Sequence, residues 1–165
     1  MNEERIIALA RHIEQAEDLL RVEDLEELED RSLEEVVRSR QPLKQFSQEC
    51  WVTGECGCIA GHAVALWPDE ARALAQRYLD EPGETLPPPT GQAADVVYDI
   101  QSATLYYRVA KQLLGVGVDD AWWLFAPSHR GGAADNELAA ERLRGLLEKD
   151  NQQPEEGDEN ENANV

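Results

Sequence analysis

Basic residues, aromatic residues and long apolar runs are all scarce in this chain of 165 residues. Lysine and arginine total 15 against 34 acidic residues, which gives a formal net charge of −19. Phosphate backbones and anionic lipid surfaces repel such a surplus of carboxylates, so we expect no direct binding to nucleic acid and none to a membrane. No apolar run approaches the roughly 20 residues that a membrane-spanning helix needs.

Cysteine is also scarce, and its placement bears on the compartment. The three residues Cys50, Cys56 and Cys58 are odd in number and clustered, which argues against a disulfide framework and for a reducing environment. The N-terminal MNEERIIALARHIEQ is acidic where a signal peptide is basic. We therefore expect a cytoplasmic protein that needs neither a disulfide nor a metal to fold, because a chain of this length buries about 70% of its extended surface.

The periodicity of the apolar residues predicts an all-α fold. Residues with helical spacing dominate, and no alternating strand pattern extends beyond a few residues. The first predicted helix carries one apolar stripe, formed by Ile6, Leu9, Ile13, Ala16 and Leu20. We expect breaks near 22–24 and 30–32 that leave two short acidic helices, and an ordered connection without strands over 43–57.

The remaining sequence predicts further helices and one tail. Helices are expected over 58–67, from Pro68 onward, over 94–114 and 118–125, and from Asp135 or Asn136 through Leu147, with a loop over 81–92. The overall prediction is a compact single-domain bundle of about six or seven helices over residues 1–149. Residues 151–165 contain five acids and no base, and we predict a disordered acidic C-terminal tail over 150–165.

The acidic residues concentrate in an N-terminal arm, about 14–35. If this arm were mostly helical, its 22 residues would span about 33 Å, close to one turn of B-DNA. Its carboxylates would offer about half the charge density of the phosphates along that length. They are therefore candidates for contact with a basic protein partner, although a solvated helix face has the same composition. The arm holds eleven acids: Glu14, Glu17, Asp18, Glu23, Asp24, Glu26, Glu27, Glu29, Asp30, Glu34 and Glu35.

A second cluster combines cysteine and histidine, as Cys50, Cys56, Cys58 and His62. Residues four apart share a helix face, so Cys58 and His62 could meet. One interpretation is a buried structural role, since cysteine packs as a small apolar residue. Another is a zinc site, because three thiolates and one imidazole are an accepted structural ligand set. A third is a cysteine nucleophile at a helix N-terminus, where the orphan backbone N–H groups acidify a thiol.

Of the two chemical interpretations, structural zinc fits this cluster better than catalysis does. The segment ECGCIAGHAVAL resembles the start of the catalytic helix in papain-like bacteriocin-processing peptidases. Those enzymes take their histidine from a later strand. The only later histidine here is His129, in the glycine-rich APSHRGG, with no strand pattern near it. We therefore predict no catalytic residues and no obligatory cofactor, with zinc as the alternative.

A wider pattern resembles uncharacterised small proteins of bacteriophages and bacteria. Those proteins share a W…CG(x)nCIAG[WH]A core followed by an LGL…A…LF.P element. The matching blocks here are Trp51, CGCIAGHA over 56–63, LLGV over 113–116 and AWWLFAP over 121–127. The resemblance implies a small helical accessory protein carried by a phage.

The function predicted from charge and resemblance together is non-enzymatic. We expect an acidic protein-interaction module, and specifically a phage-derived inhibitor that mimics nucleic acid towards a basic host protein such as a defence nuclease. The alternative is a protein whose function depends on the cysteine/histidine cluster. The carboxylates of the acidic arm carry the first hypothesis, and Cys50, Cys56, Cys58 and His62 carry the second.

Overall fold

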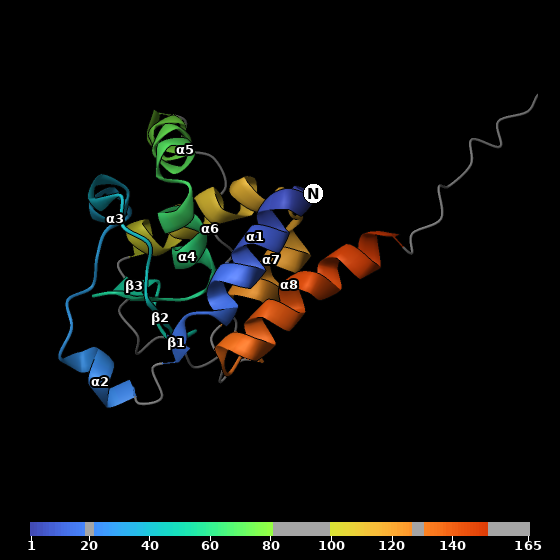
Figure 1. Ribbon diagram of the computed structural model, residues 1–165. Coiled ribbons are helices and arrows are strands. Elements are labelled where there is room, and N and C mark those ends of the chain that lie inside the picture. The colour runs from blue at the N-terminus through green and yellow to red at the C-terminus, as the bar shows by residue number, and fades with distance from the viewer. Residues whose placement is uncertain (19–21, 81–99, 127–130, 152–165) are drawn as a thin grey trace, which may run out of the picture.

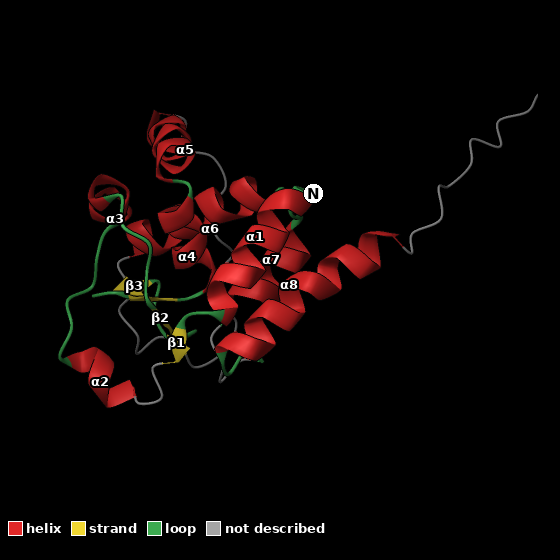
Figure 2. Ribbon diagram, viewed as in Figure 1, coloured by secondary structure: helices red, strands yellow, loops and turns green. Residues whose placement is uncertain are grey.

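A computed structural model describes residues 1–18, 22–80, 100–126 and 131–151, and these residues are mostly helical (Figures 1 and 2). Eight helices occur in them, against the six or seven predicted for the chain. They are α1 (Glu3–Glu14), α2 (Val22–Glu26), α3 (Leu33–Ser39), α4 (Ile59–Leu66), α5 (Pro68–Asp80), α6 (Ile100–Leu114), α7 (Val118–Phe125) and α8 (Asn136–Asn151). Four two-residue strands complete the regular structure of these residues: β1 (Glu17–Asp18), β2 (Gln45–Phe46), β3 (Val52–Thr53) and β4 (Cys56–Gly57).

The first helix begins as predicted and ends earlier than predicted. The side chain of Asn2 accepts a hydrogen bond from the Arg5 amide at 3.2 Å, which satisfies one of the free N–H groups of the first turn. Ile6, Leu9 and Ile13 of the apolar stripe are buried, but the backbone leaves the helix after Glu14 and enters β1. The prediction of a helical stripe is therefore wrong for residues 15–18, and Leu20 lies outside the described residues. Ala16 stays buried at 9% exposure, because the chain turns over the same core.

The small sheet corrects the all-α prediction to a mostly helical fold. Its strand order is β1-β2-β4-β3, with β1 and β4 parallel to β2 and β3 antiparallel to β4. Three of its strands lie in residues 43–57, where we expected a connection without strands. A two-residue strand has no measurable alternation, so the sequence pattern contains no signal for it.

Helix α4 lies in the centre of the apolar core. Seven of its eight residues are buried, from Ile59 to Ala65. One core cluster joins α4 to α1, α6, α7 and α8, and a second joins it to α3, α5 and α6. Helices α1 and α8 lie side by side over one flank (Figure 1). The cysteine/histidine motif is therefore built around the most enclosed helix in the described part of the molecule.

Several predicted segments lie outside the described residues. These are the loop over 81–92 and the first residues of the helix predicted from 94, and His129 also lies there. Asp150 and Asn151 belong to α8, and the rest of the predicted tail also lies outside the described residues.

Candidate functional site

The eleven acids of the arm do not lie on one continuous helix. They are distributed over the end of α1, β1, α2, the turn after α2, and the start of α3. The arm therefore does not form the continuous helix on which the comparison with one turn of B-DNA was conditional. The chain uses the segment after α1 to build the edge strand β1, and this bends the acidic run around the sheet (Figure 1).

Several of these carboxylates bind the protein's own groups. Glu14 forms a bidentate ion pair with Arg144 of α8, at 2.6 and 2.7 Å, and this partner lowers the pKa of Glu14. Asp18 accepts a hydrogen bond from the Asn136 amide at the start of α8, at 2.9 Å. Glu34 pairs with Arg38 one turn along α3. These acids contribute to the fold and are less available to a partner.

The acids in and after α2 form a different group, which we call the acidic segment: Asp24, Glu26, Glu27 and Glu29. All four are exposed, and none of their side chains has a hydrogen-bond or ion-pair partner within the described residues. In Figure 1, α2 lies apart from the helical body, on the side of the small sheet. An exposed surface that lies apart from the helical body and carries only negative charge is suited to contact with a basic partner.

The C-terminal end of the acidic segment is fixed to the β3–β4 hairpin. The Gly54 amide donates to the Glu29 carbonyl at 2.9 Å, and the Arg31 amide donates to the Val52 carbonyl at 2.9 Å. The buried Tyr106 hydroxyl donates to the carbonyl of Arg31, also at 2.9 Å. Sequence analysis missed Tyr106 as an anchor, because a contact 75 residues away in the chain leaves no local pattern.

Asp30 is the member of the acidic arm that adds a side-chain anchor to this connection. The Thr53 hydroxyl donates to its carboxylate at 2.7 Å. The other end of the acidic run is fixed by β1, which pairs with β2. The acidic segment is thus a charged stretch of chain between two points of attachment, β1 before it and the β3–β4 hairpin after it.

The cysteines of the second candidate site are all buried, and each is a free thiol. Burial raises the pKa of Cys58 to about 12, and the pKa of Cys56 is also raised, first by a hydrogen bond with the Cys50 thiol and then by burial. A hydrogen bond with the Cys56 side chain lowers the pKa of Cys50, whose thiol donates to the carbonyl oxygens of Ser47 at 3.9 Å and Cys56 at 3.8 Å. Cys58 and Cys56 are therefore protonated at neutral pH, which does not suit a nucleophile.

His62 is fully buried on α4. Its Nε2 lies 2.9 Å from the Gln45 carbonyl oxygen, so Nε2 holds the proton and donates it, while Nδ1 has no partner within the described residues. Burial lowers the pKa of His62 to about 3. The ring lies 5.1 Å from that of His12, whose Nε2 is 3.2 Å from the Leu43 carbonyl and whose pKa burial also lowers. In their neutral forms, the two imidazoles attach the chain around β2 to helices α1 and α4.

The four predicted metal ligands are near one another in sequence, but they do not form a ligand group in the structure. Among the described residues, no set of three or more histidine, cysteine, aspartate or glutamate side chains is arranged to hold a metal ion. His62 uses Nε2 for the Gln45 carbonyl, so Nδ1 is the atom it has left for any ligand. The zinc hypothesis remains a prediction.

Close packing explains why the CGCIAGHA motif has glycine at positions 57 and 61. A Cβ on Gly61 would lie 2.1 Å from the Trp51 carbonyl oxygen, and one on Gly57 would lie 2.5 Å from the Leu43 side chain. The side-chain amide of Gln48 accepts from the Ile59 amide at the start of α4 and donates to the Leu124 carbonyl of α7. The motif therefore brings the hairpin into contact with α4.

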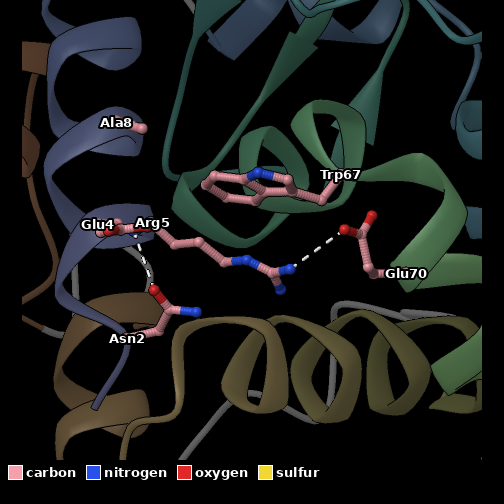
Figure 3. Close-up of a pocket in the computed structure, with 6 residues that line it drawn as sticks. All are labelled: Asn2, Glu4, Arg5, Ala8, Trp67 and Glu70. Atoms are coloured by element: carbon pink, nitrogen blue, oxygen red, sulfur yellow. Dashed lines mark hydrogen bonds and ion pairs between the residues drawn. The ribbon is translucent and has the colours of Figure 1, made fainter.

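One open pocket of about 390 Å³ lies between the start of α1 and the α4–α5 junction, and Figure 3 shows its lining. Arg5 extends across it, 5.3 Å above the Trp67 ring, and forms an ion pair with Glu70 at 3.2 Å. Its Nη1 also donates to the Leu113 carbonyl. The pocket contains none of the predicted site residues. Its Arg5 already stacks on the Trp67 ring and pairs with the Glu70 carboxylate.

Comparisons with known proteins return no relative of this chain. The chain matches no protein-family model, and neither a curated protein nor a solved structure is significantly similar to it. Within the described residues, no helix combines the length and the apolar character that crossing a membrane requires.

Proposed function

We propose that this protein is an acidic protein-interaction module without enzymatic activity, and that it binds a basic partner through the acidic segment. The observation that carries the proposal is the contrast within the acidic arm. Acids such as Glu14 and Asp18 are paired within the fold, whereas Asp24, Glu26, Glu27 and Glu29 are exposed on a segment attached at both ends.

The partner's chemistry follows from the sign of the charge. Clustered carboxylates attract a groove lined by lysine and arginine and accelerate its association. Such grooves normally bind nucleic acid, so the proposed partner is a nucleic-acid-binding host protein such as a defence nuclease, and the proposed role is an inhibitor that mimics nucleic acid. The phage origin in this proposal rests on the resemblance of the CGCIAGHA motif.

The test compares two variants with the same net charge. One carries Asp24→Asn, Glu26→Gln, Glu27→Gln and Glu29→Gln. The control neutralises four exposed acids of α8 instead, with Glu137→Gln, Glu141→Gln, Glu148→Gln and Asp150→Asn. Tagged wild-type protein and both variants are incubated with a bacterial lysate, and the captured proteins are compared by mass spectrometry.

The proposal expects one or more basic proteins that the wild type and the α8 control retain and the acidic-segment variant loses. Four exposed ion pairs at about 0.2–1 kcal/mol each correspond to a loss of affinity of about fourfold or more. Equal capture by all three proteins would refute the acidic segment as the binding surface. Equal loss from both variants would also refute it, because binding would then depend on total charge alone.

Zinc at the cysteine/histidine cluster is the second candidate function, and the unpartnered Nδ1 of His62 favours it. A buried nitrogen without a hydrogen bond is an unusual cost that a metal or a water would remove. Metal analysis of the purified protein tests this alternative. Stoichiometric zinc that is lost in Cys58→Ser would support it. A cysteine hydrolase is the weaker form of the alternative, because Cys56 and Cys58 are buried thiols with raised pKa values.

A further inference from the structure

Helix α7 packs one side into the core and presents the opposite side to solvent. The solvent side carries Val118, Trp122 and Trp123, which are 48%, 37% and 44% exposed. Asp119 lies on the same side, since residues four apart share a helix face and Asp119 precedes Trp123 by four. We call these four residues the α7 face. Large apolar side chains that are exposed together mark a surface that another molecule covers, and tryptophan is prominent among the anchors of such contacts.

Both tryptophan rings are held in place by side chains from other helices. The Trp122 ring lies 5.6 Å from the Tyr107 ring of α6. The guanidinium of Arg142 in α8 lies 5.0 Å from the centre of the Trp123 ring, and its Nη1 donates to the Trp123 carbonyl oxygen at 3.4 Å. A partner that packs on these rings therefore loses little side-chain entropy in ordering them.

The α7 face has opposite charges at its two ends. Asp119 is exposed in the first turn of α7, and the guanidinium of Arg142 lies beside Trp123 in the last turn. Neither group has an oppositely charged partner within the described residues, whereas the neighbouring Asp120 pairs with Lys149 at 2.9 Å. When two such faces meet with their helices antiparallel, each aspartate approaches the arginine of the other copy. The α7 face is thus complementary to itself, which is what a two-fold interface requires.

We propose that the protein forms a two-fold symmetric dimer in which the α7 faces of two copies pack antiparallel. Val118 and the two tryptophans form the apolar centre of this interface, and two pairs between Asp119 and Arg142 set its orientation. The net charge of −19 on each copy opposes the contact, so the dimer should be favoured when salt screens that repulsion. The α7 face shares no residue with the acidic segment, so its test is independent of the proposed function.

The test is sedimentation velocity of the purified full chain from micromolar to millimolar concentration, at low and at raised salt. The proposal expects the mass to rise from the 18.5 kDa of one chain to twice that value, and more readily at raised salt. The tryptophan emission maximum should move to shorter wavelength over the same range, because the exposed rings leave water. A variant with Trp122→Ser and Trp123→Ser should stay monomeric. The control Leu79→Ser, which removes a leucine that is 67% exposed on α5, should dimerise as the wild type does.

Charge reversal tests the antiparallel orientation. Asp119→Arg and Arg142→Asp each place like charges opposite one another at both ends of the interface, and each alone should weaken dimerisation by about fourfold or more. The double variant should recover it, because opposite charges face each other again.

Four results would each overturn the proposal: a monomer at every concentration, a dimer that the double tryptophan variant keeps, a double reversal that recovers nothing, or a dimer that salt weakens. The concentration series on the wild-type protein is decisive even where a variant fails to fold.

Discussion

Replacing His62 with glutamine should remove a pH-dependent part of the stability. The glutamine side chain places a nitrogen donor near the position of Nε2, so His62→Gln is able to keep the hydrogen bond to the Gln45 carbonyl without titrating. In the wild type, burial lowers the pKa of His62 from 6.5 to about 3. A folded-state pKa below the unfolded value means that the neutral form stabilises the fold. This contribution is complete above the unfolded pKa and is lost as the pH falls.

The magnitude follows from proton linkage. Between the unfolded pKa of 6.5 and the folded pKa of about 3, the unfolded chain binds one more proton than the native one at this site. The free energy of unfolding then decreases by about 1.4 kcal/mol for each unit by which the pH is lowered. At about pH 5 the wild type should have lost about 2 kcal/mol from this site, and the variant nothing. Other titrating groups, including His12, are common to both proteins and cancel in the difference.

The assay is urea unfolding followed by tryptophan fluorescence, which the four tryptophans provide. Measurements at about pH 7.5 and pH 5 bracket the transition of the unfolded histidine and stay above the isoelectric point of about 4.4. The wild-type urea midpoint should fall by about 1 M more than that of the variant between the two pH values. Parallel pH profiles for the two proteins would show that His62 titrates as freely in the fold as in the unfolded chain, and would refute this reasoning.

Three further predictions use matched sites. Gly61→Ala should destabilise the fold by about 3 kcal/mol or prevent folding, because its Cβ would meet a backbone oxygen. Gly145→Ala in α8 has open space around it and should stabilise the fold by about 0.5–1 kcal/mol. If urea unfolding ranks the two variants otherwise, the packing account is contradicted. Tyr106→Phe loses the hydrogen bond to the Arg31 carbonyl and should cost about 0.5–1.5 kcal/mol, with faster amide exchange in the attached segment and not in α8; uniform exchange would refute a local anchor. Alkylation of Cys58 by iodoacetamide should be slow in native protein and fast in urea, because this thiol is 2% exposed and its pKa is raised to about 12; equal rates would contradict its burial.

Helix α1 was largely predictable, because it carries its own apolar stripe over several turns. Ile6, Leu9 and Ile13 recur at helical spacing and are all fully buried. The end of α1 was not predictable, since Ala16 continues the stripe in sequence while the backbone turns into β1. The sheet was not predictable for a related reason. Its strands owe their position to contacts with α4 and to the close approach at Gly57, and not to any local alternation.

The candidate site was predictable in composition and not in arrangement. Counting charges located the acidic run, but it could not separate Glu14, which is paired with Arg144 from the far end of the chain, from Glu27, which is exposed. The cysteine/histidine motif was correctly identified as a dense local feature. Its spacing could not show that Gly61 lies against Trp51 or that His62 binds a strand carbonyl, because both contacts depend on the tertiary fold.

The salt dependence of partner binding tests the central claim most directly. The affinity of a captured basic protein is measured over a series of salt concentrations for the wild type and for the variant neutralised at Asp24, Glu26, Glu27 and Glu29. We predict that the wild-type affinity falls steeply with salt and that the variant binds more weakly with a flatter slope, because fewer exposed charges remain to be screened. An affinity that ignores salt, or an identical slope for the two proteins, would contradict the assignment of this surface.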